Sequence, residues 1–138
     1  MKFISKNPTD TMHFSKDLAS RLPGGSVIAL SGEMGAGKTV FAKGAALALG
    51  ITEEVTSPTF TIVKSYRGRD NIILHHFDAY RLSGIEEAED SGLCDLIGEP
   101  DSICVIEWPE RIRELLPEVT AWVEIRRIND TKREITIV

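Results

Sequence analysis

Apolar and polar residues follow two different periods in the first third of the chain. Residues 8–11 read Pro-Thr-Asp-Thr and supply helix-capping side chains, and mainly apolar positions then recur at helical spacing up to residue 22. Residues 26–30 form a short apolar run beside glycines, which is typical of a strand buried on both faces. Residues 38–49 return to the helical pattern and stop at Gly50. The pattern predicts a helix, a buried strand and a second helix in this order.

The rest of the chain favours strands. Residues 59–66 and 72–77 are β-rich and flank a polar hairpin loop at 67–71. An acidic helical stretch at 85–97 precedes a buried strand at 103–106, and two prolines bound a further helix at 109–117. Residues 122–125 and 134–138 alternate like two antiparallel strands with a turn at 129–130. We expect one α/β domain over residues 1–138, with a mixed central sheet, flanking helices and an antiparallel C-terminal pair of strands.

A glycine-rich loop connects the first predicted strand to the helix that follows it. Residues 32–39 read Gly-Glu-Met-Gly-Ala-Gly-Lys-Thr and fit the pattern GxxxxGK[ST]. Backbone N–H groups of such a loop surround a phosphate, and the positive end of the next helix points at the same phosphate. Lys38 would contact the β- and γ-phosphates, and the Thr39 hydroxyl would bind Mg²⁺. We therefore predict a P-loop NTPase-like domain. The expected nucleotide contacts from the loop are Glu33, Met34, Gly35, Ala36, Gly37, Lys38, Thr39 and Val40.

Two carboxylates follow predicted strands. Asp78 comes after the strand at 72–77, and Glu107 comes after the strand at 103–106. Ligands of open α/β sheets lie beyond the carboxyl ends of the strands, so both side chains should face the phosphates. One would hold the metal and the other would orient the attacking water. The spacing does not assign the two roles.

Other polar residues carry weaker signals. Residues 56–60 concentrate hydroxyls, and Thr59 is expected either to sense the γ-phosphate or the metal, or to act as a cap and turn residue. His75 and His76 fit strand residues better than catalysts, because phosphoryl transfer does not require histidine. Cys94 and Cys104 lack the spacing of a zinc site and are expected to be reduced thiols.

The overall charge limits the choice of partners. The chain has 16 basic and 21 acidic residues, a net charge of −5, which argues against tight independent binding of nucleic acid. Eleven of the acids fall in residues 81–118 against three arginines, which fits either a solvated face or a surface that binds a basic partner. No apolar run approaches the roughly 20 residues of a membrane span, and residues 1–6 lack a signal-peptide pattern. We expect a cytoplasmic protein with no membrane partner.

Several classes of nucleotide protein fit the loop. A guanine-binding Asn-Lys-x-Asp string is absent, since residues 129–132 read Asn-Asp-Thr-Lys. A small-molecule or nucleoside kinase needs a lid and a second pocket, for which 138 residues leave little chain. The residues therefore favour a minimal ATPase or an ATP-dependent switch that acts on a partner. A kinase and a nucleotide switch that does not hydrolyse ATP are the alternatives.

Four strings together resemble the bacterial TsaE family. They are the loop at 32–39, Ser-Pro-Thr-Phe at 57–60, His-Phe-Asp-Ala-Tyr-Arg-Leu at 76–82 and Glu-Trp-Pro-Glu-Arg at 107–111. The resemblance implies a small P-loop ATPase needed to make N6-threonylcarbamoyladenosine at position 37 of tRNAs that read codons beginning with A. It implies action with the TsaB and TsaD proteins, which transfer the group, and contact with tRNA only through that complex.

The resemblance also implies roles for individual residues, with ATP or ADP and Mg²⁺ as cofactors. Thr39 and Glu107 would hold Mg²⁺, Asp78 would have a catalytic or water-positioning role, and Thr59 would be the switch-loop residue. The expected catalytic set is Lys38, Asp78, Glu107 and Thr59. The remaining implied positions are Tyr80, Arg81 and Trp108 at the rim of the site, and Thr11 and Arg133 near the base or ribose.

Overall fold

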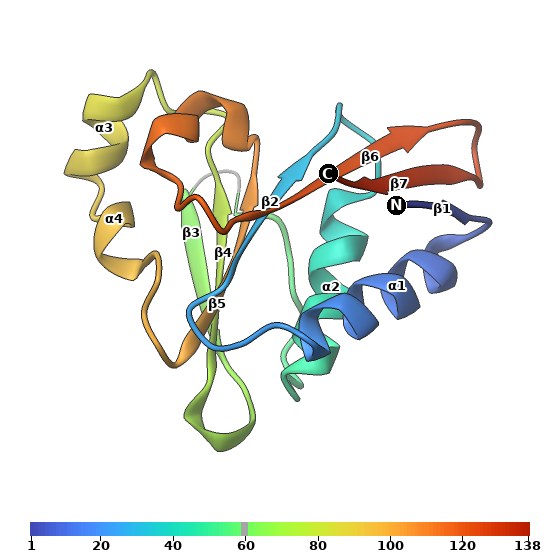
Figure 1. The fold of residues 1–138 in the computed structure, drawn as a ribbon, viewed down its shortest axis with the longest axis horizontal. Coiled ribbons are helices and arrows are strands. Elements are labelled where there is room, and N and C mark those ends of the chain that lie inside the picture. Colours follow the sequence, from blue (N-terminus) through green and yellow to red (C-terminus); the bar gives the residue numbers. More distant parts are fainter. Residues whose placement is uncertain (59–60) are drawn as a thin grey trace.

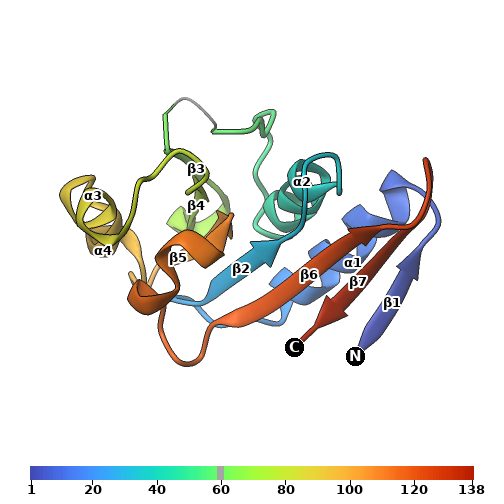
Figure 2. The same ribbon diagram turned by 90° about the horizontal axis from the view of Figure 1, so that it is seen from above.

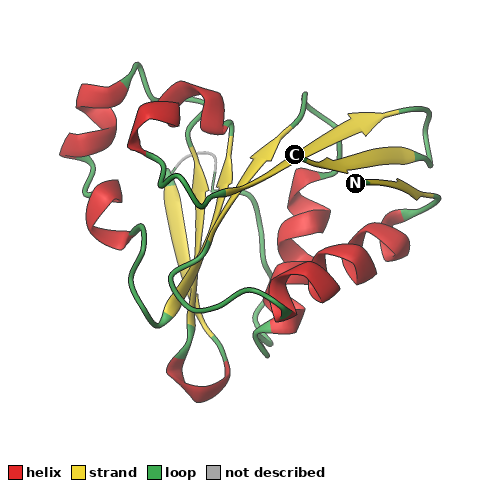
Figure 3. Ribbon diagram, in the orientation of Figure 1, coloured by secondary structure: helices red, strands yellow, loops and turns green. Residues whose placement is uncertain are grey.

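The computed structural model describes residues 1–58 and 61–138 as a sheet with helices on both faces (Figure 1). Its strands are β1 (Lys2–Ser5), β2 (Val27–Ser31), β3 (Val63–Arg67), β4 (Ile73–Asp78), β5 (Ser102–Glu107), β6 (Ala121–Arg127) and β7 (Arg133–Ile137). Its α-helices are α1 (Pro8–Ser20), α2 (Lys38–Ala48), α3 (Ile85–Asp90) and α4 (Leu93–Leu96), and its 3₁₀ helices are η1 (Arg69–Asn71) and η2 (Pro109–Leu115). Figure 3 shows these elements by type.

The sheet is mixed, with the strand order β1-β7-β6-β2-β5-β4-β3. Parallel pairing joins β6, β2, β5 and β4 in the centre, and antiparallel pairing adds β3 at one edge and β7 and β1 at the other. The N and C ends of the chain lie side by side at the edge formed by β1 and β7 (Figures 1 and 2). The four parallel strands point their carboxyl ends the same way, so their ends form one rim.

Alternate residues of the central strands pack into two separate cores. Leu74, Val105 and Leu30 face the core that includes Phe41 of α2 and Ala19 of α1. Residues of opposite parity, with Phe77 and Ile106 among them, face the core that α3, α4 and η2 cover. This alternation follows from the period of two along a strand. In Figure 1, β3, β4 and β5 lie between α3 and α4 on one side and α1 and α2 on the other.

The predicted fold class is confirmed, including the mixed sheet and the antiparallel C-terminal pair β6 and β7. The expected turn between that pair is also present, where the Asn129 side chain accepts hydrogen bonds from the backbone N–H groups of Thr131 and Lys132. No helix within residues 1–58 and 61–138 is long and apolar enough to cross a membrane.

Three predicted elements differ from the structure, and one strand was not predicted. The acidic helix at 85–97 breaks into α3 and α4, because Gly92 adopts a left-handed conformation between them. The helix at 109–117 is a 3₁₀ helix with a kink at Ile112. The strand expected from residue 59 begins at Val63, after a turn in which Ile62 has a positive φ, and residues 59–60 lie outside the described part. Strand β1 was not predicted.

Candidate functional site

The loop at residues 32–39 leaves the carboxyl end of β2 and enters α2 (Figure 2). Two of its glycines are needed for different reasons. Gly37 lies at the N-cap of α2 with φ +103°, a conformation that residues with a Cβ rarely adopt. A Cβ on Gly32 would lie 2.7 Å from the carbonyl oxygen of Ile125 in β6, so the backbone there packs too closely for a side chain. The loop thus has the backbone freedom and close packing that a phosphate-binding turn requires.

Lys38 begins α2 and is buried. Its Nζ donates a 2.5 Å hydrogen bond to the carbonyl oxygen of Gly32 and lies 3.8 Å from the centre of the Trp108 ring. Burial lowers the pKa of Lys38 below its usual value, and the carboxylates of Glu107, Asp78 and Glu110 oppose this shift. The lysine therefore sits in a partly desolvated position beside negative charge, where an added phosphate would favour its charged form further.

Asp78 and Glu107 end the adjacent parallel strands β4 and β5 and are paired in register with each other. Glu107 is also paired in register with Leu30 of β2, two residues before the glycine-rich loop begins at Gly32. Both carboxylates are buried, and the Asp78 Oδ1 accepts a 2.9 Å hydrogen bond from the backbone N–H of Tyr80. The structure thus brings Lys38, Asp78 and Glu107 together at one rim of the sheet.

The two histidines of β4 face opposite sides of the sheet. His75 lies between Ser65, at 2.7 Å from its Nδ1, and Glu99, at 2.9 Å from its Nε2. His76 is fully buried, and its Nε2 lies 2.6 Å from Oε2 of Glu107. The sequence indicated strand positions for both but missed this contact. The spacing of two residues places His76 and Asp78 on the same face of β4, but the sequence does not give the register of β4 and β5 that brings His76 to Glu107.

An aromatic rim covers the loop from the side of η2. The Trp108 ring lies 4.9 Å from the ring of Tyr80, and the Arg111 guanidinium lies 5.5 Å from the Tyr80 ring centre. Trp108 has φ +57°, an unusual conformation for a bulky residue that costs roughly 1–3 kcal/mol. The hydroxyl of Ser31 donates to the carboxylate of Glu110, which fixes this segment to the end of β2. This segment therefore holds the Trp108 ring over Lys38.

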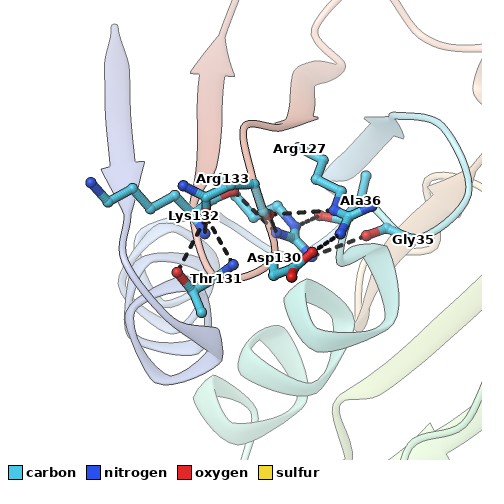
Figure 4. Close-up of polar contacts among 8 residues, drawn as sticks. Gly35, Ala36, Arg127, Asp130, Thr131, Lys132 and Arg133 are labelled. Carbon is cyan, nitrogen blue, oxygen red and sulfur yellow. Dashed lines mark hydrogen bonds and ion pairs between the residues drawn. The ribbon is translucent and has the colours of Figure 1, made fainter.

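Arg133 at the start of β7 fixes the other side of the loop (Figure 4). Its Nε donates to the carbonyl oxygen of Ala36 at 2.9 Å, and its Nη2 donates to that of Gly35 at 3.1 Å. A small pocket beside the loop is lined by Asn7, Pro8, Thr11, Gly37, Val40, Asp130, Thr131 and Arg133. The structure therefore places Thr11, Val40 and Arg133 around one pocket that adjoins Gly37.

The remaining predicted residues are spread around this centre. Thr39 is half-buried in the first turn of α2, while Glu33 and Met34 are exposed at the tip of the loop. Arg81 lies exposed beyond Tyr80. Thr59 lies outside the described residues.

The residues at the rim fit a magnesium ion held jointly with phosphates. Within the part of the chain that the structure describes, no group of three or more His, Cys, Asp or Glu side chains is arranged to hold a metal. Mg²⁺ in nucleotide sites is bound by one or two protein oxygens together with phosphate oxygens and water, and Thr39, Asp78 and Glu107 supply hydroxyl and carboxylate oxygens of that kind.

Comparison with known proteins gives one consistent result. The family model described as "Threonylcarbamoyl adenosine biosynthesis protein TsaE" matches residues 5–135. The tRNA threonylcarbamoyladenosine biosynthesis protein TsaE of Treponema pallidum is 43% identical over 99% of both chains. The protein of that name from Bacillus subtilis is 42% identical over 99% of this chain and 84% of its own. The crystal structure of Bacillus subtilis YdiB superposes with a TM-score of 0.79 at 37% identity, covering 99% of this chain and 83% of that one.

Proposed function

Because the chain belongs to the TsaE family of threonylcarbamoyl adenosine biosynthesis proteins, we propose that it serves the formation of threonylcarbamoyladenosine in tRNA as a Mg²⁺-dependent ATPase. The observation that carries the ATPase assignment is the meeting of Lys38, Asp78 and Glu107 at the rim from which the glycine-rich loop leaves the sheet. ATP and its product ADP bind with their phosphates against residues 32–39 and the N-terminus of α2. The sugar and base lie toward the pocket that contains Thr11 and Arg133.

The residues at the rim divide the chemistry among them. Lys38 neutralises negative charge on the β- and γ-phosphates, which requires its Nζ to leave the Gly32 carbonyl or to share its protons with it. Thr39 and Glu107 would hold Mg²⁺, which would supply positive charge beside the phosphates. Asp78 orients the water that attacks the γ-phosphate, and the products are ADP and inorganic phosphate. Thr59 is proposed to respond to the γ-phosphate, as its place in the Ser-Pro-Thr-Phe string implies.

We propose that ATP hydrolysis supports the TsaB–TsaD pair, which carries out the transfer to tRNA. The net charge of −5 supports an indirect role toward tRNA, because a protein that bound tRNA alone would need a positive surface. The partly exposed Tyr80 and the segment around Trp108 form the side of the site from which a partner would sense the nucleotide. Because the pathway in which we propose this protein acts modifies tRNA, we assign the protein to the cytoplasm.

Steady-state ATP hydrolysis tests this proposal. The purified chain is assayed alone and with the TsaB–TsaD pair, with Lys38→Ala as the inactive control. The proposal predicts slow ADP formation that rises on addition of the pair and is lost in the control. Equal rates with and without the pair contradict the partnership. ADP formation that depends on an added small-molecule phosphate acceptor, with no protein partner present, would establish the kinase alternative.

A further inference from the structure

A buried histidine contacts the carboxylate to which we assign magnesium. The Nε2 of His76 lies 2.6 Å from Oε2 of Glu107, and both side chains are buried. An ionised carboxylate only accepts hydrogen bonds, so Nε2 must carry a hydrogen and donate it. We propose that His76 is a positioning residue that holds the Glu107 carboxylate in the orientation that binds Mg²⁺. This inference rests on the metal role proposed for Glu107.

The register of the sheet explains how His76 reaches Glu107. In the parallel pair of β4 and β5, His76 lies opposite Val105 and Asp78 lies opposite Glu107. All four side chains share the face that packs toward α2, with His76 one step further from the rim than Asp78. His76 therefore approaches Glu107 from the interior of the protein, while the loop lies beyond the rim. A donor in that position fixes the carboxylate without competing for the space in which phosphates bind.

The other ring nitrogen, Nδ1, shows that His76 does more than fill space in the core. Among the residues that the structure describes, His76 Nδ1 has no hydrogen-bond partner although it is buried. A buried polar atom without a partner destabilises a folded chain, and an apolar side chain at this position would avoid that cost. The neighbouring His75 has partners for both of its nitrogens. What His76 supplies and an apolar residue lacks is the N–H group that points at Glu107.

Removal of such an outer hydrogen bond has a characteristic effect. Carboxylates that bind metals are oriented by hydrogen bonds from residues behind them, and loss of that partner typically weakens metal binding about 10- to 100-fold. Loss of His76 should therefore weaken Mg²⁺ and leave the Mg²⁺-independent contacts of the nucleotide with the loop unchanged. If His76 only packed against the sheet, its loss would change the stability of the protein and leave the Mg²⁺ affinity unchanged.

The test uses two substitutions that differ only in reach. A glutamine amide nitrogen extends about as far as Nε2 of histidine and can still donate to Glu107, whereas an asparagine amide extends only to the position of Nδ1. The affinity for ADP is measured by calorimetry on the full chain, first with EDTA and then at a series of Mg²⁺ concentrations. We expect His76→Asn to raise the half-effective Mg²⁺ concentration about tenfold or more, and His76→Gln to stay within about threefold of wild type. ADP affinity in EDTA should not change.

The control for the strand itself is His75→Asn, which alters the adjacent residue on the opposite face and should leave both readouts unchanged. Wild-type Mg²⁺ dependence in His76→Asn overturns the inference, and so does a His76→Gln variant as impaired as His76→Asn. Glu107→Gln separates this failure from that of the premise. If that variant keeps the wild-type Mg²⁺ effect, the metal assignment of the proposed function fails and the inference falls with it.

A measurement on the wild-type chain decides the matter if the variants do not fold. Long-range ¹H–¹⁵N spectra show which ring nitrogen of each histidine carries hydrogen. The three histidines are His13, His75 and His76, so His13→Gln and His75→Asn assign the third by elimination. A hydrogen on Nε2 of His76 supports the inference. A hydrogen on Nδ1 alone overturns it, because Nε2 then has nothing to donate.

Discussion

Arg133 is predicted to hold the glycine-rich loop in the conformation that binds phosphate. Its guanidinium donates through Nε to Ala36 and through Nη2 to Gly35, two consecutive residues of the loop (Figure 4). It also donates through Nη1 to the carbonyl oxygens of Asn129 and Lys132, in the turn between β6 and β7. The side chain thus connects that turn to the loop. The perturbation that tests this connection is Arg133→Ala.

The size of the effect follows from the two loop contacts. The bond to Ala36 is partly buried and has a charged donor, for which about 1.5 kcal/mol is a reasonable value. The bond to Gly35 is solvent-exposed and contributes about 0.5 kcal/mol. Their loss should lower the free energy of unfolding by about 2 kcal/mol, and the loss of the two Nη1 hydrogen bonds to Asn129 and Lys132 adds to this. If most of this energy keeps the unliganded loop ordered, ADP affinity should fall at least about tenfold, since each 1.4 kcal/mol is a factor of ten.

Two further variants make the experiment specific. Arg133→Lys keeps the charge but cannot place two donors on neighbouring carbonyls at once, so its ADP affinity should lie between wild type and Arg133→Ala. Arg127→Ala removes an exposed arginine of the same hairpin, which pairs with Asp130. This variant should change the free energy of unfolding and the free energy of ADP binding by at most about 0.5 kcal/mol each.

The assays are urea denaturation and calorimetric titration with ADP in EDTA. A wild-type free energy of unfolding and a wild-type ADP affinity in Arg133→Ala would show that Arg133 does not hold the loop, because the two hydrogen bonds would then contribute nothing to it. A large loss of ADP affinity or stability in Arg127→Ala would show the same, since the effect would then belong to the charge of the hairpin.

Three further predictions concern the loop, the helix packing and a buried thiol. Lys38→Ala should weaken ADP at least about tenfold in calorimetry, because a charged contact to phosphate is lost; an unchanged affinity contradicts the loop assignment. Gly44→Ala should lower stability to urea by about 1–3 kcal/mol, because its Cβ would lie 1.7 Å from the Ser15 hydroxyl oxygen and 2.5 Å from a backbone oxygen of α1; a variant as stable as wild type shows that α1 and α2 can separate freely. Burial raises the pKa of Cys104 to about 11, whereas Cys94 is exposed. One thiol per native chain, that of Cys94, should therefore react with a disulfide reagent at pH 8. The protonated Cys104 thiol contributes to the free energy of unfolding, and this contribution should fall as the pH rises from about 9 to about 11, because the unfolded chain loses the thiol proton first.

The parts of the site that the sequence predicts are those that depend on local pattern. The glycine spacing at 32–39 specifies the turn, and the apolar run before it specifies a buried strand. Asp78 and Glu107 meet because parallel strands end at the same rim, which is a general property of such sheets. Each of these inferences needs only a few neighbouring residues and one topological rule.

The parts that the sequence did not reveal depend on contacts between distant segments. Strand β1 has four residues and pairs with β7 at the other end of the chain, so its short pattern carries no signal of its own. The break at Gly92 follows from a left-handed conformation that the helical spacing around it conceals. The contact of His76 with Glu107 requires the relative register of β4 and β5, which no local pattern specifies.

We propose that this chain serves threonylcarbamoyladenosine formation through its nucleotide site. A bacterium depleted of its own TsaE allows a test of this role, in which the threonylcarbamoyladenosine content of tRNA is measured with mass spectrometry. Expression of this chain should restore the modification, and Lys38→Ala and Glu107→Gln should not, although both proteins accumulate. Full restoration by Lys38→Ala would contradict the account, and so would failure of the folded wild-type chain to restore any modification together with a failure to bind ADP.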